Sequence, residues 1–262
     1  LQELVARYNT VEQAKFQAEH LGLDFSDFLL EDQQYQTALK ETMVQLEIHG
    51  RLQILDRGFL PNFMFPKEAL VVVLGQDGLV ANTLKYLDGQ SVLALNPDPK
   101  RWDGKLLPFV PRALDKLLPE VLRSKRPTKE IVLGLATLSD GQKLLAVNDF
   151  YIGAKSHVSS RYQISSGSVH EQHSSSGVII STGLGSTGWL RSVLTGASAI
   201  AGGANKKAKQ LCESGFAWES QRLVFSVREP FPSISSQTNC VFGDVSPHKP
   251  LIIRSLMPEG GV

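Results

Sequence analysis

The first arrangement in this sequence that could do chemistry is a carboxylate in a four-residue turn that begins and ends with glycine. Gly75-Gln76-Asp77-Gly78 directly follows the apolar residues 71–74, and an apolar helical pattern comes next. In open α/β sheets, ligands bind beyond the carboxyl ends of the strands, where glycines let the backbone approach a phosphate and a helix N-terminus attracts it. A carboxylate there can hold a metal or take a proton from an attacking hydroxyl. We therefore predict a phosphate-handling turn tight enough to need its glycines, with an ordinary Asp-Gly turn as the alternative.

Asn96 and Asp98 leave the next predicted strand, in the run NPDPKRWDG at residues 96–104. Because the carboxyl ends of neighbouring parallel strands meet at one edge of a sheet, this loop could line the same crevice as Asp77. Its prolines fit a stiffened surface loop equally well.

Asn148 and Asp149 form a third polar pair, at the end of a predicted strand. An Asn side chain can read the edge of a nucleobase, and a carboxylate can accept a pair of ribose hydroxyls. Adjacent Asn and Asp residues are also common in turns, so this pair predicts little by itself.

A glycine-rich loop, STGLGSTGW, occupies residues 181–189. Gly183, Gly185 and Gly188 have the spacing of the dinucleotide fingerprint, but the loop lies among predicted strands and no acidic residue closes a second strand at the required distance. We therefore reject a Rossmann fingerprint here. A loop of this kind can still bind phosphate through its amides while Trp189 stacks on a base.

Several function classes are excluded by what the chain contains. It has neither a GxSxG motif nor a P-loop, and His170 and His173 lie in a Ser-rich run that predicts solvated histidines rather than a metal site. The net charge of +1 argues against a nucleic-acid partner, and neither a spanning run nor an amphipathic membrane-binding stretch is present. Two cysteines without CxxC spacing favour a reduced, intracellular setting.

The elements that must position these residues change character along the chain. Residues 1–50 have helical periodicity, with Ser26 as a candidate cap for a second helix. Apolar runs then alternate with helical patterns, which predicts a parallel sheet covered on both faces. The expected strands are 51–55, 69–74 and 91–95, and the expected helices are 79–87 and 112–123.

Beyond a boundary near residue 125 the pattern becomes β-rich. The turn 139–142 joins two predicted strands, and a helix should follow the glycine-rich loop. The run 165–177 is predicted as a polar loop or hairpin tip. We therefore expect domains at 1–125 and 126–262, with the C-terminal segment alternatively returning to the first domain. Further strands are expected at 157–164, 177–182, 221–228 and 250–256.

Taken together and in this order, the four polar segments resemble the NAD kinase family. Its members carry GGDG after a strand, then an Asn-containing loop, an Asn-Glu pair and a glycine loop ending in GSTAY. Here these read GQDG, ALNPDP, VNDF and GSTGW. Within the family, the sequence looks more like the mitochondrial-type branch and its bacterial relatives, which have runs similar to NPDPKRWDG, NDFYIGAKSHVSSRYQIS and LVFSVREP. The resemblance covers most of residues 70–230.

The resemblance implies a Rossmann-like N-terminal α/β domain followed by a β-rich C-terminal domain, with NAD in the cleft between them. It implies transfer of a phosphoryl group from ATP, with Mg²⁺, to the 2′-hydroxyl of the adenosine ribose of NAD, giving NADP. It also implies a homodimer or homotetramer, in the bacterial cytoplasm rather than the mitochondrial matrix.

Roles for individual residues follow from the resemblance by position. Asp77 would orient or deprotonate the hydroxyl, and Gly75, Gln76 and Gly78 would form the phosphate turn. No residue is assigned as a metal ligand. The dinucleotide would contact the residues that match the family's other motifs: Asn96, Asn148, Asp149, Ser176, Thr187, Gly188, Trp189 and Ser192.

Three positions depart from the family's motifs. Gln76 replaces a glycine of GGDG, Leu79 replaces the Thr that follows, and Asp149 replaces Glu. A side chain at position 76 would crowd the triphosphate or demand a backbone angle that Gln tolerates poorly. Three hypotheses therefore stand: an active NAD kinase, a binding protein that has lost efficient transfer, and a kinase for another hydroxyl. The Asn148-Asp149 pair and Trp189 favour a nucleotide acceptor over a lipid.

Overall fold

The computed structural model describes residues 1–202 and 206–257, which form two compact units. The first unit is Leu1–Pro127, and the second begins at Thr128. Helices and a parallel strand pair make up the first unit, whereas antiparallel sheets dominate the second. The expected order, an α/β half followed by a β-rich half, is therefore confirmed.

A parallel strand pair lies at the centre of the first unit. β1 (Val71–Leu74) pairs with β2 (Val92–Leu95), and α4 (Asp77–Leu84) lies between them in the chain. Alternate side chains point to opposite faces, as a strand requires. Leu74, Leu93 and Leu95 pack in one hydrophobic cluster and Val73 and Ala94 in another. The predicted parallel sheet with both faces covered is thus confirmed.

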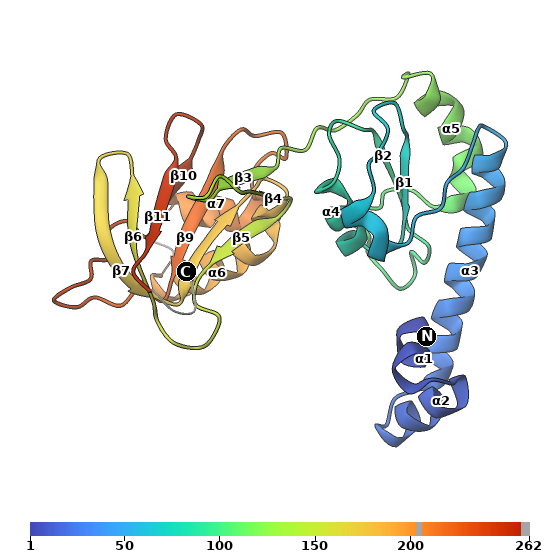
Figure 1. Ribbon diagram of the computed structural model, residues 1–262, viewed down its shortest axis with the longest axis horizontal. Helices are drawn as coiled ribbons and strands as arrows, with labels where there is room; N and C mark the ends of the chain where they lie inside the picture. Colours follow the sequence, from blue (N-terminus) through green and yellow to red (C-terminus); the bar gives the residue numbers. More distant parts are fainter. Residues whose placement is uncertain (203–205, 258–262) are drawn as a thin grey trace. The chain divides into compact units, whose positions relative to one another are not determined.

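The helices that cover these two faces come from different parts of the chain. α3 (Phe25–Glu47) and α5 (Leu114–Leu122) supply Ala38, Leu114 and Leu118 to one cluster, whereas α4 supplies Val80 to the other. Figure 1 shows α4 on one side of β1 and β2, with α3 and α5 on the other. The remaining helical elements of this unit are α1 (Gln2–Tyr8), α2 (Val11–His20), η1 (Arg57–Asn62) and η2 (Pro111–Ala113).

Two local predictions for the first unit were wrong. Residues 51–56, all of which the structure describes, form no strand. The cap of α3 is Asp24 rather than Ser26, because the Asp24 carboxylate accepts both the backbone amide and the hydroxyl of Ser26, at 2.9 and 2.6 Å. A carboxylate at this position satisfies amides that the helix itself leaves unpaired.

The second unit stacks two antiparallel sheets and covers the larger one with helices. One sheet has the order β10-β9-β8-β5 and the other β11-β6-β7, and β3 and β4 form a separate hairpin. The strands are β3 (Gly134–Thr137), β4 (Lys143–Ala146), β5 (Asp149–Ile152), β6 (Ser160–Ser166), β7 (Val169–Ser175), β8 (Gly177–Ser181), β9 (Leu223–Arg228), β10 (Phe242–Val245) and β11 (Leu251–Ser255).

The core of this unit again follows strand alternation. Phe225 and Val227 of β9 pack with Tyr162 and Ile164 of β6, whereas Val224 packs with Leu190 on the opposite face. The helices on that face are α6 (Trp189–Ile200), preceded by η3 (Gly185–Thr187), and α7 (Lys206–Ser214). Figure 1 shows α6 and α7 on one side of the sheet that contains β9.

The run 165–177 contains a hairpin tip at residues 167–168, as one alternative predicted, but most of it is the strand β7 rather than a polar loop. β6 and β7 pair from Ser160 opposite Ser175 to Ser166 opposite Val169, so only the residues between them form the tip. His173, predicted to be solvated, is 2% exposed, and its Nε2 lies 2.9 Å from Glu171 Oε2. His173 can be buried on this edge strand because Glu171 is a partner for its Nε2.

The C-terminal segment also differs from one expectation. β11 pairs with β6, with Leu251 opposite Ser166 and Ser255 opposite Tyr162. The described part of this segment therefore adds a strand to the second unit instead of returning to the first. Residues 258–262 lie outside the described residues.

Candidate functional site

Asp77 lies where the sequence predicted a reactive carboxylate, at the carboxyl end of β1 and in the first turn of α4. Its Oδ1 accepts the backbone amide of Leu106 at 2.8 Å, and its Oδ2 accepts that of Lys105 at 3.2 Å. A carboxylate offers about four acceptor sites. Asp77 is thus held by two amides and retains acceptor capacity for a further donor.

The turn that carries Asp77 does not need its glycines for their backbone angles. Neither Gly75 nor Gly78 has a positive φ, and Gln76 has ordinary extended angles of −105° and 164°. A Cβ at Gly75 would lie 2.9 Å from Leu79 Cδ2, whereas a Cβ at Gly78 would meet no described atom within 4 Å. The predicted strain at Gln76 is therefore absent, and crowding remains the only cost that its side chain can impose.

The loop after β2 contacts the Asp77 turn, but Asn96 is not one of its exposed residues. Asn96 is 3% exposed. Its side-chain Nδ2 donates to Trp102 O at 2.9 Å, and its Oδ1 accepts the backbone amide of Asp98 at 3.0 Å. Gly104 has φ +59°, and a Cβ there would lie 2.5 Å from Asn96 Nδ2. Asn96 therefore shapes the loop that supplies the amides of Lys105 and Leu106 to Asp77.

Asp149 is the most strongly perturbed acid in the second unit. It begins β5, opposite Ser181, and its Oδ1 is buried without a hydrogen-bond partner in the described part of the chain. Burial raises the pKa of Asp149 to about 6, and the Ser181 side chain partly opposes that rise. Asn148 beside it is exposed. A carboxyl group with a raised pKa and a buried, unpartnered oxygen is a candidate for a functional acid.

The glycine-rich loop is folded tightly against the chain itself. A Cβ at Gly183 would lie 2.0 Å from Ala217 O, and one at Gly185 would lie 2.2 Å from Asn148 O. These two glycines therefore permit the close approach of protein backbone. The preceding strand, β8, is antiparallel to both of its neighbours, β5 and β9. A Rossmann fingerprint needs a parallel βαβ unit, which agrees with its rejection from sequence.

Trp189 begins α6 and already has an aromatic partner. Its ring stacks on Tyr151 at 5.4 Å between centroids, and the Arg228 guanidinium lies 5.6 Å from it. Tyr151 donates its hydroxyl to Ser176 O at 2.8 Å, which fixes the ring. Trp189 remains 42% exposed. The other predicted contacts Ser176, Thr187, Gly188 and Ser192 are also exposed.

Sequence reasoning missed Tyr151 and Arg228. A signal for Tyr151 was present, because residues two apart in a strand share a face and Asp149 had been singled out. Arg228 ends β9, and the pairing of Gly177 with Arg228 brings it beside the segment that carries Ser176. Only the strand order of the sheet reveals this second neighbour.

Comparison with known proteins identifies the fold. No family model and no curated protein matches the chain. Among solved structures it is similar to an NAD kinase from Archaeoglobus fulgidus in complex with ATP. The two are 16% identical over 84% of this chain and 76% of that chain, with a TM-score of 0.53. The protein therefore has the NAD kinase fold, as the motif resemblance predicted.

A yeast NADH kinase complexed with NADH is a weaker match. It is 18% identical over 71% of this chain, with a TM-score of 0.42, and the chain spans only 47% of its length. The fold assignment rests on the archaeal protein.

The described residues contain no group of three or more His, Cys, Asp or Glu side chains that could hold a metal ion. In the same ranges, no helix has the length and apolar character needed to cross a bilayer.

Proposed function

We propose that the protein is an NAD kinase, which transfers the terminal phosphoryl group of ATP to the 2′-hydroxyl of the adenosine ribose of NAD. The observation that carries this proposal is the Asp77 carboxylate, placed at the carboxyl end of β1 and the N-terminus of α4 in a chain with the NAD kinase fold. Helix N-termini favour phosphate, and a carboxylate beside one can direct the attacking hydroxyl.

Asp77 would act on the acceptor hydroxyl. Phosphoryl transfer depends mainly on positioning and on neutralising charge, so one well-held carboxylate is enough to orient the nucleophile. As the new O–P bond forms, the bond to ADP breaks and the hydroxyl proton passes to Asp77. The open space over Gly78 leaves room for a ligand to approach the amides of the first helical turn.

The second unit would hold the dinucleotide. Asp149 would turn its carboxylate toward the ligand to accept ribose hydroxyls, because its unpartnered Oδ1 is buried in the ligand-free chain, and the Tyr151–Trp189 stack would support a base. The exposed residues Asn148, Ser176, Thr187, Gly188 and Ser192 are proposed as further contacts. The buried Asn96 is reassigned from a direct contact to a residue that shapes the loop.

Mg²⁺ fits this arrangement as an ion carried by ATP. Mg²⁺ in nucleotide sites is bound largely by substrate phosphates and waters, so the ion would arrive with ATP, and no residue of this chain is assigned to hold it. When bound, the ion would neutralise charge on the phosphates.

A binding protein without efficient transfer is the main alternative, because Gln76 and Leu79 depart from the motif where the phosphates are expected. A kinase for another hydroxyl is the third hypothesis, and Asp149 with its aromatic neighbours favours a nucleotide over it. An assay of ATP-dependent NADP formation, combined with calorimetric binding of NAD and ATP, separates the three. Binding of NAD without NADP formation would select the binding protein.

Gln76→Gly is expected to raise the rate of NAD phosphorylation. The extended angles at position 76 suit glycine as well as glutamine, so the substitution removes a side chain without relieving backbone strain. If that side chain crowds the phosphates by about 1.4 kcal/mol in the transition state, the rate should increase about tenfold. Steady-state NADP formation measures the effect. A lower rate would instead show that Gln76 donates its own amide to phosphate.

Trp189→Ala is expected to weaken dinucleotide binding by about 1–3 kcal/mol, the usual contribution of a base–aromatic stack. Calorimetry with NAD measures it, and Tyr151→Phe is the matched control because it keeps the stack and loses only the bond to Ser176. Unchanged affinity in Trp189→Ala would make the stack an internal packing contact.

We also propose a homodimer or homotetramer in the bacterial cytoplasm. Light scattering coupled to size-exclusion chromatography tests the assembly, and a mass equal to one chain would contradict it.

A further inference from the structure

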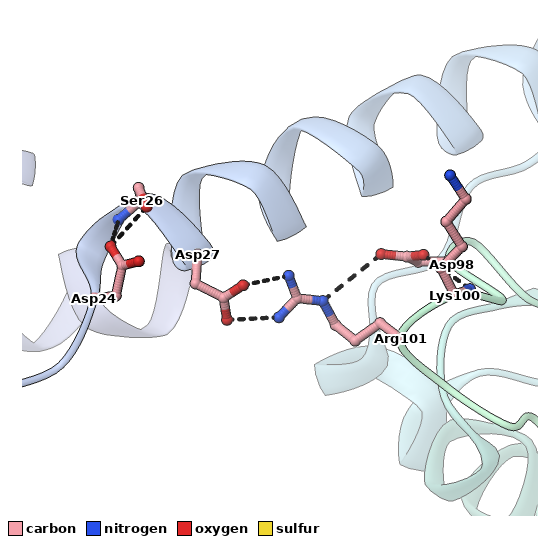
Figure 2. Close-up of polar contacts among 6 residues, drawn as sticks. All are labelled: Asp24, Ser26, Asp27, Asp98, Lys100 and Arg101. Atoms are coloured by element: carbon pink, nitrogen blue, oxygen red, sulfur yellow. Dashed lines mark hydrogen bonds and ion pairs between the residues drawn. The ribbon is translucent and has the colours of Figure 1, made fainter.

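Arg101 joins the start of α3 to the loop that follows β2. Its two terminal nitrogens donate to both oxygens of Asp27, at 2.7 and 2.6 Å, and its Nε lies 3.6 Å from Asp98 Oδ2. Figure 2 shows the guanidinium between these two carboxylates. The Arg101 side chain is 22% exposed and that of Asp98 17%. The planar guanidinium makes two parallel hydrogen bonds to the carboxylate, so the pair fixes the relative orientation of the two side chains in addition to pairing their charges.

This pair is not needed to cap α3. Asp24 already accepts the amide and hydroxyl of Ser26 at the start of that helix, as Figure 2 shows. The Asp27 carboxylate is therefore not used as the helix cap and can bind Arg101 instead. Hydrogen bonds from Arg101 hold the pKa of Asp27 below its usual value, because they favour the ionised carboxylate.

The loop that carries Arg101 also contacts Asp77, through residues near its far end. The backbone amides of Arg101 and Trp102 donate to Asp98 O, and Trp102 O accepts the buried Asn96 side chain. Only three and four residues beyond Trp102, the amides of Lys105 and Leu106 donate to the Asp77 carboxylate. A short, internally bonded segment thus connects the guanidinium to the candidate catalytic acid.

We propose that Arg101 is a positioning residue for Asp77: by fastening this loop to α3, it keeps the amides of Lys105 and Leu106 aimed at the carboxylate. The catalytic part of this inference rests on the proposed function. The Asp27 side chain is 55% exposed, and an ion pair with a solvent-exposed partner contributes little to global stability, so the effect of losing Arg101 should be local. A lysine could replace the charge but not the two parallel hydrogen bonds.

The test measures amide hydrogen exchange by NMR on the ligand-free protein. Arg101→Gln should speed exchange at Lys105 and Leu106 by about tenfold, because the loop opens more often, while the melting temperature stays nearly constant. Arg101→Lys should give a smaller increase, and Asp27→Asn a change in the same direction. Lys15→Gln, which removes the exposed pair with Glu19 in the same unit, is the matched control and should change neither amide.

Activity gives a second, separable readout. In an active kinase, Arg101→Gln should lower kcat while leaving KM for ATP nearly unchanged, since Arg101 acts on the orientation of Asp77 rather than on binding. Unchanged exchange at both amides would overturn the inference whether or not the protein is a kinase. Faster exchange with an unchanged kcat would overturn its catalytic part. An inactive wild type would refute the proposed function and leave the exchange result to decide the role of Arg101.

Discussion

Asp77→Asn is expected to reduce ATP-dependent NADP formation by about 10²- to 10⁴-fold, the range that a positioned acid or base contributes. The amide keeps the size of the carboxylate but cannot take the proton of the acceptor hydroxyl. It also places an NH₂ group against one of the two backbone donors, Lys105 or Leu106, that now bind carboxylate oxygens. The loss should fall on kcat, and calorimetry should show NAD affinity nearly unchanged because the proposed dinucleotide contacts lie in the second unit.

Asp88→Asn is the control for this prediction, because Asp88 is an exposed acid shortly after the same helix. It should retain wild-type turnover. Amide hydrogen exchange at Lys105 and Leu106 in Asp77→Asn shows whether the loop has become more mobile. Unchanged exchange with lost turnover would assign the loss to the missing carboxylate itself. Full turnover in Asp77→Asn would remove Asp77 as the catalytic group and, with it, the observation that carries the proposed function.

Asp149→Asn is expected to stabilise the protein near pH 7.5 while weakening dinucleotide binding. Burial raises the pKa of Asp149 from 3.8 to about 6, so the native state pays to hold this group ionised. A shift of about two pKa units corresponds to about 3 kcal/mol, and we expect about 2 kcal/mol to be recovered by the neutral amide. Chemical denaturation at pH 7.5 measures this gain in the free energy of unfolding.

The pH dependence of stability provides an internal control. Because the folded-state pKa of Asp149 lies above its unfolded value, the native state binds the proton more tightly. This group therefore weakens folding as pH rises from about 4 to about 6, with the full penalty above that range. The difference in stability between variant and wild type should grow over the same interval. A difference that does not vary with pH would contradict the raised pKa.

The affinity for NAD should change in the direction opposite to the stability, both with rising pH and in the Asp149→Asn variant. If ionised Asp149 accepts ribose hydroxyls, NAD binding by the wild type should strengthen as pH rises through about 6, and Asp149→Asn should lose both affinity and this dependence. An acid that lowers stability yet strengthens binding is the pattern expected of a functional group. Equal NAD affinity in variant and wild type would leave Asp149 as a structural acid.

Local patterns were enough to predict much of the framework. The apolar runs that became β1, β2, β8 and β9 are short and continuous and are followed by turn or polar residues, so they can be recognised as buried strands from their neighbours in the sequence. The order of four motifs was enough to predict the NAD kinase fold, since each motif marks the end of a strand or a loop between elements. The strands β5 and β10, in which no residue is fully buried, were missed, and so were the polar strand β7 and the helix α7.

The sequence by itself thus determined which residues stand at strand ends and helix starts, Asp77 and Trp189 among them. Only the tertiary structure decided what those residues touch. In the folded chain Asn96 and His173 are buried, and the ring of Tyr151 stacks on that of Trp189. Asp27 binds Arg101, which lies 74 positions away in the sequence. The physical reason is that local spacing sets the direction of a side chain, whereas its partners, burial and pKa depend on contacts between segments far apart in sequence.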